Sequence, residues 1–162
     1  MARMLTLAII ITILSIFFPK PGGRFKGYEY RLNESTAYPL DNYRVYEDDG
    51  GRFLIESCTG PDTLVTVSAP EDLPARIDAI VRSHKLWMLK KHYSLPFDLR
   101  DGFIWNVYIR YEKNSIISGG HQCRPPAKLR EGIEKINELL RTSFESALAA
   151  GTVIADESGE TR

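Results

Sequence analysis

Three side chains could do nucleophilic or metal chemistry: Cys58, Cys123 and His121. Residues i and i+2 of a strand point to the same face, so His121 and Cys123 could form a nucleophile–base pair. Together with Cys58 they could offer three ligands to zinc, although structural zinc sites commonly use four ligands in paired motifs. No orienting third group or oxyanion-hole motif accompanies the pair. The sequence therefore favours neither a metal centre nor any other cofactor site.

The two cysteines have a second interpretation. In an exported chain an even cysteine count indicates a disulfide, here between Cys58 and Cys123. The alternative is two separate thiols, because spacing along the chain says nothing about proximity. The carboxylates Asp98 and Asp101 complete the set from which an enzyme of unfamiliar type could draw its catalytic groups.

A basic and aromatic cluster forms a candidate binding surface for an anion or a polysaccharide. Its members are His84, Lys85, Lys90, Lys91, His92 and Tyr93. The alternative is the solvated end of a helix, where cations complement the helix dipole. The tyrosines are a second candidate strip, or else ordinary members of a packed sheet. They are Tyr28, Tyr30, Tyr43, Tyr46, Tyr108 and Tyr111.

The first 23 residues have the pattern of a secretory signal. Arg3 precedes an uncharged apolar run over 4–18, and Pro19–Gly23 breaks any helix that follows. As a helix the run would reach about 22 Å at 1.5 Å per residue, less than the roughly 30 Å of a hydrocarbon core. We expect export to the periplasm, the cell surface or the extracellular space, with residues 4–18 either removed or kept as a short anchor. The further alternative is a buried apolar element.

Charge is balanced, with 21 basic and 21 acidic residues. This balance predicts no nucleic-acid partner and gives no electrostatic reason to expect an anionic membrane surface. Membrane contact is expected only through the N-terminal segment.

The spacing of apolar residues along the sequence predicts the strands and helices that carry these groups. Alternation predicts strands near 28–32, 43–46, 52–58 and 63–68, then near 102–111 and 115–118, where Gly119–Gly120 ends or bulges the strand. Helical spacing predicts helices over 71–86 and 127–149, the first with a capping box at Ser68–Glu71 or an N-cap at Asp72. Residues 90–101 are expected as a loop. The fold class is α+β: an antiparallel sheet of about six strands with two amphipathic helices packed on one face. We expect one domain over 24–150 and a flexible polar tail over 151–162.

The strand after Gly102 and the second helix should share the core. Their apolar stripes consist of Trp105, Val107, Ile109 and Tyr111 on the strand, and Ile133, Ile136 and Leu140 on the helix.

The stretch from Arg100 to Leu140 resembles a family of small uncharacterised bacterial proteins. It carries Asp101-Gly102-x-x-Trp105, alternation to Tyr111, a polar turn, Ser118-Gly119, a proline and a leucine-rich helix. Many members of that family are exported or lipid-anchored, so the resemblance implies the same fold and compartment and no activity. The chain departs from the family in having Arg124-Pro125 instead of an aromatic-proline pair, and in lacking the lipid-bearing cysteine.

These observations predict a non-enzymatic domain of the bacterial cell envelope that binds an envelope protein or a surface polymer. The rivals are the unfamiliar enzyme that uses Cys123 and His121 or Asp98 and Asp101, and a purely structural or inhibitory module.

Overall fold

The structure is a computed structural model that describes residues 19–34, 42–58, 63–96 and 102–157. In chain order the elements are β1 (Phe25–Glu34), β2 (Tyr43–Glu47), β3 (Phe53–Cys58), β4 (Leu64–Ser68), α2 (Leu73–His84), the 3-10 helix η1 (Leu86–Met88), β5 (His92–Ser94), β6 (Phe103–Tyr111), β7 (Ser115–His121), α3 (Ala127–Ala149) and β8 (Val153–Glu157).

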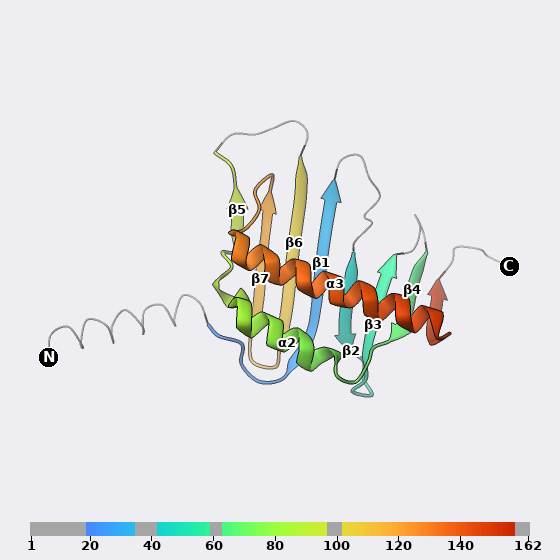
Figure 1. Ribbon diagram of the computed structural model, residues 1–162. Helices are drawn as coiled ribbons and strands as arrows, with labels where there is room; N and C mark the ends of the chain where they lie inside the picture. Colours follow the sequence, from blue (N-terminus) through green and yellow to red (C-terminus); the bar gives the residue numbers. More distant parts are fainter. Residues whose placement is uncertain (1–18, 35–41, 59–62, 97–101, 158–162) are drawn as a thin grey trace, which may run out of the picture.

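The strands of the described chain form one sheet of eight, in the order β5-β7-β6-β1-β2-β3-β4-β8. Every neighbouring pair is antiparallel except β5 and β7, which run parallel. Both helices cross the same face of the sheet (Figure 1). The expected α+β class, with a largely antiparallel sheet and two helices on one face, is confirmed.

Two edge strands correct the expected count of about six. β5 lies inside the stretch predicted as a loop, and β8 lies in the stretch predicted as a flexible tail. Neither has a local signal, because β5 has only three residues and β8 belongs to a polar C-terminal segment. Each is a strand because a neighbour offers an unpaired backbone edge: β7 pairs with β5 and β4 pairs with β8.

The core lies between the sheet and the two helices. Burial alternates along β6, so Trp105, Val107, Ile109 and Tyr111 face the helices while Ile104 is 45% exposed on the other face. Ile133, Ile136 and Leu140 of α3 are 0–4% exposed. All seven side chains expected in the core are therefore buried.

The glycine pair at 119–120 does not end β7, which continues to His121. Gly120 lies directly opposite Trp105, and a β-carbon there would approach the indole Nε1 to 2.5 Å. The glycine makes room for the tryptophan, which is why it interrupts the pattern without interrupting the strand.

The helix boundaries differ slightly from the prediction. α3 spans Ala127–Ala149 as expected, whereas α2 is shorter, and neither a capping box nor a side-chain cap from Asp72 forms. Lys85 takes a left-handed conformation (φ 54°) that ends α2 and leads into η1. Neither helix of the described chain has the length and apolar character of a membrane span. Residues 4–18, expected as signal or anchor, lie outside the described residues.

Candidate ligand-binding groove

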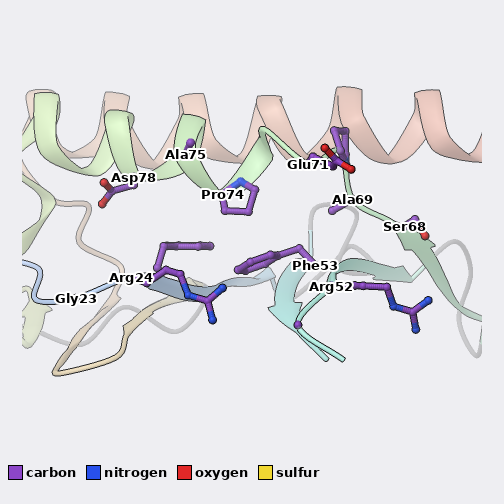
Figure 2. Close-up of a pocket in the computed structure, with 13 residues that line it drawn as sticks. Gly23, Arg24, Arg52, Phe53, Ser68, Ala69, Glu71, Pro74, Ala75 and Asp78 are labelled. Atoms are coloured by element: carbon purple, nitrogen blue, oxygen red, sulfur yellow. The ribbon is translucent and has the colours of Figure 1, made fainter. Parts of the chain in front are cut away.

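An open groove of about 710 Å³ lies between the N-terminal half of α2 and the adjoining ends of β1, β3 and β4 (Figure 2). This volume falls within the usual range for ligand sites. The groove is lined by Gly23, Arg24, Phe25, Gly51, Arg52, Phe53, Ser68, Ala69, Pro70, Glu71, Pro74, Ala75 and Asp78.

The floor of the groove is aromatic. The rings of Phe25 and Phe53 stack with centroids 5.9 Å apart, and Tyr111 meets Phe25 edge-on at 5.8 Å. Phe25 is only 4% exposed, so the floor continues into the core. Pro74 and Ala75 of α2 face this floor from above (Figure 2). A ligand in the groove would therefore bury apolar surface against a rigid floor.

The rim carries two exposed guanidinium groups, each with an acidic partner. Arg24 Nη2 lies 2.6 Å from Glu47 Oε1, and Arg52 Nη2 lies 2.9 Å from Asp48 Oδ2. Hydrogen bonds from Lys26 and Arg24 hold the pKa of Glu47 below its usual value. The side chains of Arg24 and Arg52 are 54% and 74% exposed, so both still reach solvent. The rim thus presents charges of both signs.

Asp78 closes one end of the groove and is already engaged. The Tyr111 hydroxyl donates to Asp78 Oδ1 at 2.8 Å, and Arg82 Nε donates to Oδ2 at 2.7 Å. Burial, supported by this hydrogen bond, raises the pKa of Tyr111, so the phenol stays a neutral donor. Asp78 therefore holds α2 to the sheet.

The lining of the groove carries one hydroxyl and two carboxylates, those of Ser68, Glu71 and Asp78. Of its described lining residues only Ser68 carries a hydroxyl, and no histidine or cysteine accompanies it. Sequence reasoning missed this site because its walls come from three separate segments, 23–25, 51–53 and 68–78, and each phenylalanine or proline alone has an ordinary packing role.

The cysteines are too far apart to be bridged, so the disulfide that the sequence left open as one of two alternatives does not form. Cys58 ends β3, whereas Cys123 follows β7, four strand positions away, and both are free. Four spacings of about 4.8 Å separate them by roughly 19 Å, whereas bridged Cα atoms lie within about 7 Å.

His121 and Cys123 lie on different sides of the sheet. His121 pairs with Ile104 on the uncovered face, whereas the Cys123 carbonyl oxygen accepts the Trp105 indole N–H at 2.7 Å on the helix-covered side. Between them Gln122 takes φ 55°, which breaks the alternation on which the predicted pair depended. In the described chain no three His, Cys, Asp or Glu side chains group closely enough to hold a metal ion. Asp98 and Asp101 lie outside the described residues.

The candidate basic surface is divided between different environments. Tyr93 belongs to the core, at 9% exposed and with its ring 5.8 Å from that of Trp105, which corrects its surface assignment. His84 sits between the helices, with Nδ1 3.0 Å from the Lys128 carbonyl oxygen. The exposed members are Lys85, Lys90, Lys91 and His92.

The tyrosines do not form one exposed strip either. Tyr28, Tyr43 and Tyr111 are 1–7% exposed on the helix-covered face. Tyr46 and Tyr108 lie on the uncovered face, where Arg44 sits 4.7 Å over the Tyr46 ring.

Comparison with known proteins finds no matching family, no matching curated protein and no matching solved structure. Function must therefore be argued from the geometry of this chain.

The separation of Cys58 and Cys123 predicts that both thiols are free in the native protein. The purified native protein, unreduced, should titrate two thiols with Ellman's reagent, because the sheet holds Cys58 and Cys123 apart. Exposed Cys58 should react before half-buried Cys123. A Cys58→Ser variant should lose the fast phase, and native protein without free thiols would contradict this arrangement of the sheet.

Proposed function

We propose that the chain is a non-catalytic binding domain of the bacterial cell envelope, which holds an apolar segment of a partner protein in the groove beside α2. One observation carries the proposal: an open groove of about 710 Å³ with an aromatic floor and a lining without a nucleophile–base pair. Pockets of this kind orient a ligand with a few polar groups and gain affinity from buried apolar area.

The lining favours a polypeptide over a surface polymer. Sugar polymers need many unpaired polar groups to satisfy their hydroxyls, whereas Arg24 and Arg52 at this rim already have acidic partners. Phenylalanine, proline and alanine offer contact area without hydrogen bonds. A segment with one or two large apolar side chains flanked by charges matches both the floor and the rim.

A charge placed inside the groove should abolish binding. Ala75 is exposed on α2 and lines the groove, so Ala75→Glu adds a carboxylate above Phe25 and Phe53 without removing a core contact. We expect selection from a displayed library of random peptides to yield ligands with large apolar residues. Their affinity for Ala75→Glu should fall at least tenfold, because the new carboxylate would be desolvated on binding.

Ala79→Glu is the matched control, since Ala79 lies one turn further along α2, is exposed and does not line the groove. It should bind the selected peptides as the unmodified protein does. Peptides affected equally by the two variants would contradict the groove as the site. Binding of soluble surface polysaccharides in place of peptides would contradict the partner class, and an absence of any ligand would favour the structural module.

The compartment is the second part of the proposal. It is supported by Arg3, the apolar run over 4–18 and the breaker at Pro19–Gly23, and by the resemblance of 100–140 to exported bacterial proteins.

Residues 1–30 fused to alkaline phosphatase lacking its own signal should give enzyme activity in a bacterial host, because that reporter requires the oxidising periplasm. Replacing Ile10 and Ile11 by aspartate should abolish the activity, since a charged run cannot be inserted. An inactive fusion that stays in the cytoplasm would overturn the envelope assignment and leave the groove proposal to its own test.

A further inference from the structure

The described chain begins on one particular surface of the domain. Residues 19–22 lie along the turn between β6 and β7, where Asn114 Nδ2 donates to the Lys20 carbonyl at 2.8 Å and the Gly22 N–H donates to Asn114 Oδ1 at 3.0 Å. The Lys113 N–H donates to the Gly22 carbonyl at 3.1 Å. Figure 1 shows this blue stretch passing beside the turn that joins β6 and β7. The described chain therefore begins at a defined place on the domain, and the apolar run over 4–18 directly precedes it in the sequence.

That place is flanked by exposed apolar side chains. Pro19 lines a hollow of about 430 Å³ with Trp87, Leu89, Lys90, Lys91, Ser115, Ile116 and Ile117. Ile117 is 55% exposed and Met88, next to Trp87, is 44% exposed. Three of these side chains, Trp87, Met88 and Ile117, are of the kind that partitions into a membrane interface.

Four lysines lie on the segments around the hollow. The segments 19–22, 87–94 and 113–123 contain Lys20, Lys90, Lys91 and Lys113, and the adjoining acidic residue, Glu112, pairs with Arg24 at 3.6 Å. All four lysines are exposed, and none forms an ion pair within the described part of the chain. Since the whole chain has a net charge of zero, the rest of the chain carries 17 basic and 21 acidic residues. The equal numbers of basic and acidic residues in the whole chain give no indication of this lysine cluster.

We propose that this surface, formed by Trp87, Met88, Ile117 and the four lysines, docks onto an anionic phospholipid membrane. The lysines pair with lipid phosphates while the three apolar side chains enter the headgroup region. Two features favour a membrane as the occupant: the four unpaired lysines, and the apolar run over 4–18 that precedes Pro19 in the sequence. The proposal is separate from the groove, which lies beside α2 at other residues.

The test uses the full chain in lipid vesicles, so that residues 4–18 are present in every sample. Trp87 is half-buried at the surface whereas Trp105 is 2% exposed in the core, so quenching of tryptophan fluorescence by brominated lipid reports on Trp87. We expect strong quenching in vesicles that contain phosphatidylglycerol and little in pure phosphatidylcholine. Salt at 0.5 M should reverse it, because screening weakens contacts between surface charges.

Two matched double variants separate docking from simple loss of charge. Lys90→Gln with Lys91→Gln should lower the ratio of docked to undocked protein by about 30-fold, taking roughly fivefold for each lysine near an anionic surface. Lys128→Gln with Lys135→Gln removes the same charge from α3 and should leave quenching unchanged. Trp87→Phe should remove the quenched signal.

Equal quenching in the two kinds of vesicle would overturn the proposal. So would equal loss in the two double variants, or quenching that survives in Trp87→Phe. None of these three results bears on the groove, whose peptide binding is measured without lipid.

Discussion

Trp105→Ala should lower the free energy of unfolding by about 3–5 kcal/mol, the range for large aromatic side chains removed from a core. Trp105 is 2% exposed and its ring centre lies 5.8 Å from that of Tyr93, so neighbouring side chains would line the space it leaves. The variant also removes the donor for the Cys123 carbonyl oxygen. Since domains of this size are stable by about 5–15 kcal/mol, urea denaturation should show a large shift in midpoint.

Ile104→Ala is the control, because Ile104 is the adjacent residue of β6 and is 45% exposed on the other face. It should change stability by no more than about 0.5 kcal/mol, as surface substitutions usually do. If the two variants had equal midpoints, the helices would have to cover the opposite face of the sheet.

Gly120→Ala should cost about 2–3 kcal/mol, at the upper end of the range for overpacked sites. The added methyl group would lie 2.5 Å from both the Cys123 carbonyl oxygen and the Trp105 Nε1, the two atoms that form the indole hydrogen bond. One of these atoms is backbone and the other belongs to a packed ring, so neither can move aside cheaply. Thermal unfolding measured by circular dichroism should show a lower midpoint.

Gly50→Ala gives the comparison at an open site. A β-carbon there meets side-chain atoms alone, with Asp48 Oδ1 nearest at 3.3 Å and Arg52 Nε at 3.9 Å. Its midpoint should stay close to that of the unmodified protein, because exposed side-chain atoms at this distance need to shift only slightly. A stable Gly120→Ala would mean that the chain after β7 does not return over Trp105.

The predicted strands, helices and core were largely confirmed, whereas the predicted nucleophile–base pair and the surface position of Tyr93 were wrong. The wrong predictions depended on how residues of different segments lie relative to one another. His121 and Cys123 were placed on one face by the alternation of a strand, but β7 ends at His121 and Gln122 turns the chain. Tyr93 was grouped with its basic neighbours, but pairing of β5 with β7 turns its ring toward Trp105. In each case a short irregular segment decided the outcome.

The sequence by itself determined the elements whose apolar residues recur with a strong period. The alternation from Trp105 to Tyr111 and the stripe from Ile133 to Leu140 could be buried only by facing each other, so strand, helix and core followed from local pattern. Only the tertiary structure decided the order of the strands. β1 lies between β6 and β2 at the centre of the sheet, and the edges recruit β5 and β8 through backbone pairing that no side-chain period encodes. The groove beside α2 and the lysine surface at Pro19 are consequences of that order. Each is lined by side chains from segments that are far apart in the sequence and become neighbours only when the strands pair.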